Sequence, residues 1–227
     1  MQTLIFDCDG VLVDSEALAE ETLAERLGNW LPDLDLERLL SQALGMTTAD
    51  ILDHLERLSR HSLPPDAAEH IDSAIEARLG AELCAIAGAA EAITAIALPK
   101  AVVSNSRRSR VVASLATTGL DTVLGQAPIF TAEQVERPKP DPAIYRLAAR
   151  ELGLAPRECL VVEDSVAGVS AAHAAGMTVI GFTGASHLDA GQGARLLQAG
   201  AWQVIDRLSE LEGWVNDWQR AADSIQP

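Results

Sequence analysis

The chain has 227 residues, of which 48% are hydrophobic, and this is enough apolar material for a full core plus a smaller second unit. Only 4% of the residues are aromatic, which fits an α/β or helical protein. Its formal net charge of −16 argues against nucleic acid and anionic membrane surfaces, which bind clustered Lys and Arg. Three cysteines without paired or metal-type spacing, and no signal-peptide pattern or apolar stretch near the ~20 residues that span a bilayer, predict a soluble cytoplasmic protein.

The first predicted element is a short apolar strand that ends in two acids, Asp7 and Asp9, followed by Gly10. Side chains alternate faces along a strand, so both carboxylates leave it on the same side at its carboxyl end. That end is where open α/β sheets place their ligand crevice. Because two like charges so close together repel, a cation or a shared proton must compensate for them. The pattern therefore indicates chemistry at this strand end.

The next segment reads as helices only. From Glu16 to Glu82, apolar residues recur at the three- and four-residue spacing of a helix, and glycines and prolines divide the segment. No strand pattern is evident. We therefore expect a helical unit over residues 16–83, inserted between the first strand and the remainder of the chain.

Beyond residue 84, strands and helices alternate, which predicts a parallel sheet covered by helices on both faces. The first strand must join this sheet, because a lone strand is not stable. We therefore expect an α/β core made of residues 1–15 and 84–227. Its further strands are predicted at 101–104, 128–130, 160–162, 178–181 and 203–205.

The second predicted strand runs into Ser104, Asn105 and Ser106 ahead of a helix. A hydroxyl together with free backbone N–H groups at a helix start forms a phosphate-sized anion site. Alternatively, Ser104 or Ser106 simply caps the helix.

A proline-rich loop, Arg137–Pro142, holds Lys139, which is one of only two lysines in the chain. Its flanking prolines restrict the backbone, and its positive charge beside an acidic cleft would bind a phosphate oxygen and neutralise a carboxylate. A solvated loop lysine is the alternative. Asp141 and Pro142 suit the start of the following helix and are interpreted as structural.

The apolar strand 160–162 ends in Glu163 and Asp164, followed by Ser165. Carboxylates converging from two strands offer only oxygen ligands, which suit a hard octahedral cation such as Mg²⁺. The alternative is that Asp164 caps the next helix.

Taken together, these motifs resemble those of the haloacid-dehalogenase-like superfamily of aspartate-nucleophile phosphotransferases. The resemblance spans essentially the whole chain and extends to a helical cap directly after the first motif, as in the β-phosphoglucomutase and phosphoglycolate-phosphatase-like branch. Residues 179–187 also look like those of sugar-phosphate or 6-phosphogluconate phosphatases. The resemblance implies a Rossmann-like core and a cap, residues 16–83, that determines substrate specificity. The motifs are Asp7–Ser15, Val102–Asn105, Arg137–Pro142 and Val161–Gly168.

For catalysis, the resemblance implies that Asp7 attacks phosphorus and forms an aspartyl-phosphate. Asp9 would protonate the leaving alkoxide and then accept a proton from the hydrolytic water. The phosphoryl oxygens would be held by Ser104, the Asn105 N–H and Lys139.

For the metal, the resemblance implies Mg²⁺ bound by the Asp7 carboxylate, the main-chain carbonyl of Asp9 and the Asp164 carboxylate. Glu163 would be a further or water-mediated ligand.

Other activities of the superfamily fit less well. Hydrolytic dehalogenases lack the acid two residues after the nucleophile and work without metal. In the phosphomutase pattern a cap histidine stands twelve residues beyond the nucleophile, where this chain has Ala19, and a cap arginine follows a stretch like Gly45-Met46-Thr47, where it has Thr48. Both departures favour hydrolysis over a β-phosphoglucomutase-like activity. An inactive phosphate-binding module has least support, because competent residues fill every candidate position.

The acidic helical segment disfavours a polyanionic leaving group unless an arginine such as Arg78 turns inward, so the expected substrate is a small phosphorylated sugar or sugar acid. We expect a monomer or weak dimer with no nucleic-acid or membrane partner. His187, in a glycine-rich loop after a strand, is a further candidate for the cleft. Arg107 and Arg108 could reach the cleft or face solvent, and solvent is the expectation.

Overall fold

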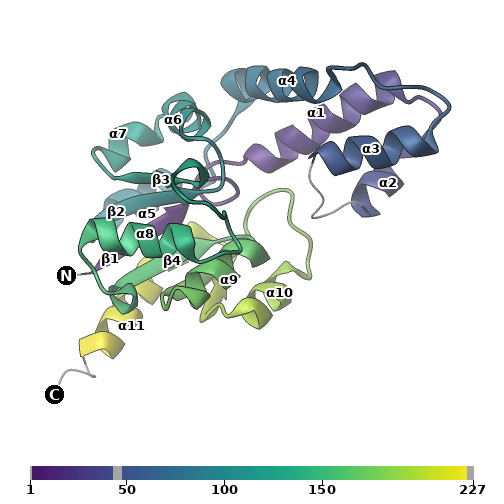
Figure 1. The fold of residues 1–227 in the computed structure, drawn as a ribbon. Coiled ribbons are helices and arrows are strands. Elements are labelled where there is room, and N and C mark those ends of the chain that lie inside the picture. Colours follow the sequence, from purple (N-terminus) through teal and green to yellow (C-terminus); the bar gives the residue numbers. More distant parts are fainter. Residues whose placement is uncertain (1, 43–47, 224–227) are drawn as a thin grey trace. The chain divides into compact units, whose positions relative to one another are not determined.

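The computed structural model describes residues 2–42 and 48–223 (Figure 1). They divide into two compact units, one built from the residues up to Asp14 together with those from Cys84 onward, and the other from Ser15–Leu83. The chain thus leaves the first unit after a single strand and returns to it at Cys84. Each unit is described by itself below.

The first unit is built on one sheet of six parallel strands, in the order β3-β2-β1-β4-β5-β6. This confirms the predicted α/β core with a parallel sheet. The first strand is central and is fully buried, as expected for an apolar strand covered on both faces. The strands are β1 (Thr3–Asp7), β2 (Lys100–Ser104), β3 (Ile129–Thr131), β4 (Cys159–Glu163), β5 (Thr178–Phe182) and β6 (Gln203–Ile205).

The strand order reverses direction between β1 and β4. From β1 the chain adds β2 and then β3 on one side, whereas β4, β5 and β6 extend the sheet on the other side. Such a switch point opens a crevice at the carboxyl ends of the two central strands. The residues that follow β1 and β4 therefore meet at this crevice.

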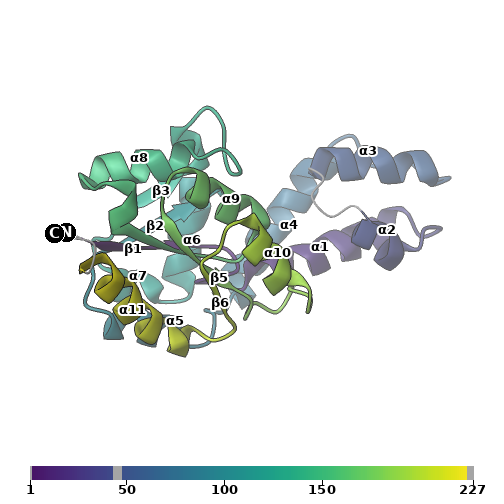
Figure 2. The same ribbon diagram turned by 90° about the horizontal axis from the view of Figure 1, so that it is seen from below.

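Helices cover both faces of the sheet. Figure 2 shows α8 and α9 on one side of it and α5 and α11 on the other. One core lies under α8 and α9, where Ile144, Tyr145 and Val169 pack against strand residues such as Ile5 and Val161. The helices of this unit are α5 (Ala89–Ala95), α6 (Arg108–Thr117), α7 (Leu120–Leu124), α8 (Ala143–Leu152), α9 (Val166–Ala174), α10 (Gln192–Ala199) and α11 (Leu211–Asp223).

The second unit is helical throughout its described residues and consists of α1 (Ser15–Trp30), α2 (Leu36–Gln42), α3 (Thr48–Leu58) and α4 (Ala67–Glu82). Its own core is formed by buried leucines and Ile71 from these helices. Arg78 on α4 pairs with Glu21 on α1 and with Glu82, which ties the two long helices together. Gly45-Met46-Thr47, part of the phosphomutase comparison, lies outside the described residues.

None of the helices in the described residues combines the length and apolar character that a transmembrane span requires.

Candidate active site

The candidate residues lie at the carboxyl ends of three neighbouring strands. Asp7 is the last residue of β1, Ser104 of β2 and Glu163 of β4. β1 pairs with β2 through Asp7 and Val103, and with β4 on its other side. The sheet therefore brings motifs that are far apart in the sequence to one edge.

Lys139 is buried at this edge. Its Nζ lies 2.5 Å from Asp7 Oδ1 and 2.6 Å from Glu163 Oε1, and its side chain is 3% exposed. It also donates to the carbonyl of Val103 at 3.3 Å. The alternative of a solvated loop lysine is therefore wrong. Burial alone would lower the pKa of Lys139, but the charges of Asp7 and Glu163 raise it well above its ordinary value, so the ammonium stays charged.

The backbone of Lys139 is held by the side chain of Asn105. Asn105 Oδ1 accepts from the Lys139 N–H at 3.0 Å, and Asn105 Nδ2 donates to the Lys139 carbonyl at 3.2 Å. The side chain of Asn105 thus fixes the loop that carries the lysine, a role that the sequence motif does not reveal. Its backbone N–H belongs to the segment predicted to bind phosphate.

Glu163 is fully buried and accepts four hydrogen bonds. Its Oε1 accepts from Lys139 and, at 3.2 Å, from the Tyr145 hydroxyl. Its Oε2 accepts from the N–H and hydroxyl of Ser165 at 2.9 and 3.0 Å. A Cβ on Gly168 would lie 1.6 Å from Glu163 Oε1, so the first turn of α9 needs a glycine there. These contacts position Glu163 mainly as a partner for Lys139.

Tyr145, the only tyrosine in the chain, is a site residue that the sequence analysis missed. It is fully buried on α8, with its ring centroid 5.1 Å from Lys139 Nζ. A tyrosine at an apolar position of a helix is typical of the core, so its pattern gives no sign of a polar role. Its single occurrence in the chain is the one available hint.

Three buried acids form a group suited to a metal ion. One carboxylate oxygen each from Asp7, Glu163 and Asp164 lies within 4.8 Å of the others. When all are ionised, these three acids and the Lys139 ammonium leave two uncompensated negative charges, which a divalent cation would neutralise. All-oxygen donors suit Mg²⁺. The residues present therefore fit the expected ion.

Burial changes the pKa of one acid in this group, and the close approach of another requires a glycine at position 10. Burial raises the pKa of Asp7 well above its ordinary value, while the Lys139 ammonium opposes that rise. Gly10 has φ +80°, and a Cβ there would lie 1.9 Å from Asp164 Oδ2. A glycine is thus required both for the turn after β1 and for the approach of Asp164.

The Asp9 side chain lies on another side of the site. Its Oδ2 accepts from the Ser106 hydroxyl at 2.8 Å and from the Ser104 hydroxyl at 3.2 Å. Within the described residues, the acidic group suited to a metal does not include its carboxylate. This is compatible with the sequence prediction, in which Asp9 offers the metal its main-chain carbonyl and keeps its side chain for proton transfer.

The capping alternatives are wrong for both serines and for Asp164. The residue before α6 is Arg107, whose side chain makes no capping bond, and the Arg108 N–H at the helix start donates to Glu133 Oε2 at 2.8 Å. At α9 the cap is Ser165, whose hydroxyl accepts from the Gly168 N–H at 2.9 Å. Ser104, Ser106 and Asp164 therefore point their polar atoms toward the site.

The structure also locates the residues whose position the sequence left open. His187 lies at the site, with Nε2 3.5 Å from Asp164 Oδ2. Arg107 and Arg108 are exposed, as expected, and Arg108 donates to the carbonyl of Ile129. Cys8 is fully buried between the two acids in sequence, and burial raises the pKa of its thiol, so it is a core residue rather than a nucleophile.

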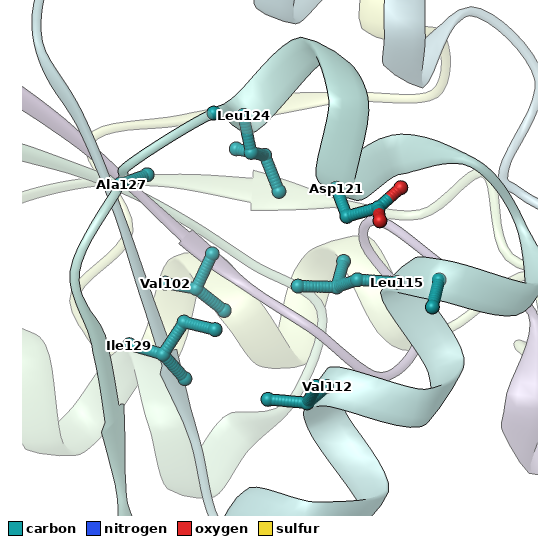
Figure 3. A pocket seen from close by; sticks show the side chains of 9 residues that line it. Val102, Val112, Leu115, Asp121, Leu124, Ala127 and Ile129 are labelled. Carbon is teal, nitrogen blue, oxygen red and sulfur yellow. The ribbon is translucent and has the colours of Figure 1, made fainter.

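A separate cavity of about 100 Å³ lies between α6, α7 and the strands β2 and β3 (Figure 3). It is lined mainly by apolar side chains such as Val112, Leu115 and Leu124, with Asp121 as its one charged residue. Its lining has no basic side chain that could bind phosphate, and only one carboxylate that could bind a cation. The strand edge is therefore the candidate site.

Comparison with known proteins gives consistent results. Residues 1–176 match the family model described as haloacid dehalogenase-like hydrolase. The chain is 33% identical over 190 residues to 6-phosphogluconate phosphatase of Escherichia coli, covering 82% of this chain and 85% of that protein. It is 33% identical over 201 residues to hexitol phosphatase A of the same organism, covering 78% and 80%.

Among solved structures, a hydrolase of the same family from Deinococcus radiodurans, with bound phosphate and sodium, has a TM-score of 0.82 and 32% identity. The match covers 96% of each chain.

Proposed function

The chain belongs to the haloacid dehalogenase-like hydrolase family and is a phosphatase of phosphoric monoesters, and we propose that it hydrolyses a small sugar phosphate or sugar-acid phosphate through an aspartyl-phosphate on Asp7. The observation that carries this proposal is the buried group at the strand edge. There Lys139 bridges Asp7 and Glu163, and Asp164 completes a cluster that fits a divalent cation.

In the first step, an oxygen of Asp7 attacks phosphorus and the bond from phosphorus to the ester oxygen breaks. Asp9 gives its proton to that oxygen, so the sugar leaves as an alcohol. In the second step, a water oxygen attacks the aspartyl-phosphate while Asp9 takes a proton from the water. Inorganic phosphate leaves, and both aspartates return to their starting states.

The phosphoryl oxygens meet positive and hydrogen-bonding groups that are already in place. Lys139 is fixed next to Asp7, because its ammonium donates to Glu163 and its backbone N–H donates to the Asn105 side chain. The Ser104 hydroxyl donates to Asp9 in this structure and would donate to the phosphoryl group in the complex, which frees Asp9 to face the leaving oxygen. Mg²⁺, bound by Asp7, Asp164, the Asp9 carbonyl and, directly or through water, Glu163, would supply positive charge that screens the incoming dianion.

The substrate class follows from two lines of support. The relatives named above act on 6-phosphogluconate and hexitol phosphates by their names, which are monoesters of a sugar acid and of sugar alcohols. Arg78, the arginine considered for a second anionic group, is committed to Glu21 and Glu82. We propose that the helical unit, residues 16–83, selects a polyol or sugar-acid leaving group and disfavours a polyanionic one.

A phosphomutase is not proposed. In the phosphomutase pattern a histidine stands at the position of Ala19 on α1, and the methyl side chain of alanine has no ionisable proton to transfer. Simple hydrolysis needs only the residues of the strand edge.

The protein is proposed to act as a monomer or weak dimer on a small phosphorylated metabolite. Exposed large apolar side chains among the described residues include Leu58 on α3, Val112 on α6 and Trp202 in the connection before β6. The buried cysteines Cys8 and Cys159 are free thiols, which suits the proposed reducing compartment, the cytoplasm.

The test is phosphate release by the purified full chain, with and without Mg²⁺, from 6-phosphogluconate, hexitol phosphates, fructose 1-phosphate, β-glucose 1-phosphate and phosphoglycolate. We expect Mg²⁺-dependent release from one or more of the sugar compounds, and none from the Asp7→Asn variant. Conversion of β-glucose 1-phosphate to glucose 6-phosphate without free phosphate would overturn hydrolysis. Release by Asp7→Asn at the wild-type rate would overturn the mechanism.

A further inference from the structure

Asp164 has a second set of partners outside the motifs, on the connection between β5 and α10 and on α10 itself. Gln192, the first residue of α10, is 6% exposed and donates its side-chain amide to the main-chain oxygen of Asp164. A buried glutamine at a helix start is otherwise uncommon, because its two polar ends both need partners. Both partners are present here.

The other end of this amide faces Arg195, one turn further along α10. Gln192 Oε1 accepts from Arg195 Nε at 2.9 Å and from Nη2 at 2.7 Å. A guanidinium only donates and a carbonyl only accepts, so the amide has a single orientation that satisfies both neighbours. Arg195 therefore determines which end of Gln192 faces Asp164.

Arg195 is held in turn by a surface carboxylate. Its Nη2 lies 2.8 Å from Asp189 Oδ2, and the other oxygen of Asp189 accepts from the Gly191 N–H at 2.6 Å. The chain of contacts thus runs from the surface through Asp189, Arg195 and Gln192 to the backbone of Asp164.

The same segment also contacts the carboxylate of Asp164. His187 lies 3.5 Å from Asp164 Oδ2, and the neighbouring Ser186 N–H donates to Asp14 at 3.3 Å. The same carboxylate oxygen of Asp164 lies close to Gly10, where a Cβ would be 1.9 Å from Oδ2 and 3.2 Å from His187 Cε1. Asp164 is therefore held both at its main-chain oxygen and at its side chain.

We propose that Gln192, oriented by Arg195, is a positioning residue for the cation site. By fixing the backbone at Asp164, it keeps that carboxylate within reach of Asp7 and Glu163 and so sets the affinity for the divalent ion. Groups that orient metal ligands typically change affinity by about 10- to 100-fold when removed. This inference rests on the proposed function, in which Asp164 binds the cation.

The test is calorimetric titration of Mg²⁺, and separately of Mn²⁺, into the full chain. Gln192→Glu keeps the size of the side chain and its acceptor for Arg195, but it turns an oxygen toward the Asp164 carbonyl. We expect its affinity for both ions to fall by about tenfold or more. We expect kcat to return toward the wild-type value at saturating Mg²⁺, since the reacting groups are unchanged.

Arg195→Ala is a second variant on the surface, where the side chain is 46% exposed, and should lower the affinity by a smaller factor. The matched control is Arg150→Ala, which removes an exposed arginine paired with Glu151 and away from Asp164. Should Gln192→Glu fail to fold, as judged by melting in chelator, Arg195→Ala decides the question.

Wild-type affinity in Gln192→Glu, or in Arg195→Ala when only that variant folds, overturns the inference even if the protein is an active phosphatase. Absence of both cation binding and phosphate release in the wild-type protein would instead overturn the proposed function and this inference with it.

Discussion

Lys139 Nζ lies 2.5 Å from Asp7 Oδ1, so the proposed nucleophile is paired with a positive charge before any substrate arrives. Both side chains are nearly inaccessible to solvent, at 3% and 9% exposure. A charge pair at that depth is weakly screened, so the Asp7 carboxylate depends on the lysine, whereas Lys139 has Glu163 as a second partner.

The first prediction concerns loss of that positive charge. Lys139→Met would leave Asp7 and Glu163 as buried carboxylates without a counter-charge, so the free energy of unfolding should fall by about 3–5 kcal/mol. The phosphoryl oxygens would also lose a charged hydrogen-bond donor in the transition state, so kcat should fall about 10²- to 10³-fold. Urea denaturation and phosphate-release kinetics measure both. The control is Lys100→Met, at the only other lysine, which should retain most activity. A kcat within about threefold of wild type in Lys139→Met would contradict the role assigned to Lys139.

The second prediction concerns the tyrosine beneath the lysine. Tyr145→Phe keeps the ring near Nζ but removes the hydroxyl that donates to Glu163. A hydrogen bond to a charged group contributes about 1.5–3 kcal/mol, so unfolding should require less urea while the fold is retained. Circular dichroism during the titration gives the result. Unchanged stability would show that the hydroxyl contributes nothing to Glu163.

The third prediction separates two serines that share Asp9 as an acceptor. Ser104→Ala removes a proposed phosphate-binding hydroxyl, so inhibition by inorganic phosphate should weaken about tenfold. Ser106→Ala removes only a donor to Asp9, so it should lower kcat and leave phosphate inhibition within about twofold of wild type. Inhibition constants and kcat from the same assays compare the two. Equal weakening of phosphate inhibition in both variants would be inconsistent with this division.

The fourth prediction uses two helical glycines in contrasting surroundings. Gly168→Ala places a Cβ against the Glu163 carboxylate, whereas nothing lies within 4 Å of a Cβ on Gly213 in α11. Gly168→Ala should therefore destabilise the protein by more than about 2 kcal/mol and abolish activity, because Glu163 must move. Gly213→Ala should stabilise it by up to about 1 kcal/mol. Thermal melting distinguishes the two, and a stable, active Gly168→Ala would refute the close packing.

The fifth prediction concerns pH without metal. The folded-state pKa of Asp7 is raised above its ordinary value of 3.8, chiefly by burial, so the folded protein binds more protons than the unfolded chain once pH exceeds that value. This group's contribution to stability therefore falls as pH rises from about 4 toward its folded pKa. Asp7→Asn lacks that loss and should be more stable than wild type at pH 7 in chelator.

At pH 3.5 and below, the advantage of Asp7→Asn should shrink, since Asp7 is increasingly protonated in both states of the wild type. Each tenfold difference in proton affinity corresponds to about 1.4 kcal/mol. Urea denaturation at several pH values gives the difference directly. An advantage that grows as pH falls would reverse the assigned direction.

The sequence predicted the fold and brought the right motifs together, because both depend on regular rules. Alternation of strands and helices indicated a parallel sheet, and parallel strands end at a common edge, so Asp7, Ser104 and Glu163 had to converge. Helix α7, with five residues, is too short to show a helical period and was not predicted.

What could not be predicted is which polar atoms pair with which. Asn105 turned its side chain to the backbone of Lys139, and the serines expected as possible caps turned to Asp9. Tyr145 and Gln192 resemble ordinary core and helix-start residues in sequence. Their roles depend on distances across the fold, which periodicity and spacing do not contain.

The placement of β1 at the centre of the sheet has a consequence for biosynthesis. Its two neighbours are β2 and β4, and Leu4 pairs with Leu160. The first strand therefore cannot complete its pairing until most of the chain has been synthesised. Such distant pairing slows folding and leaves apolar segments uncovered meanwhile. A product terminated before Cys159 lacks β4, so the central strand β1 has no hydrogen-bonding neighbour on that side.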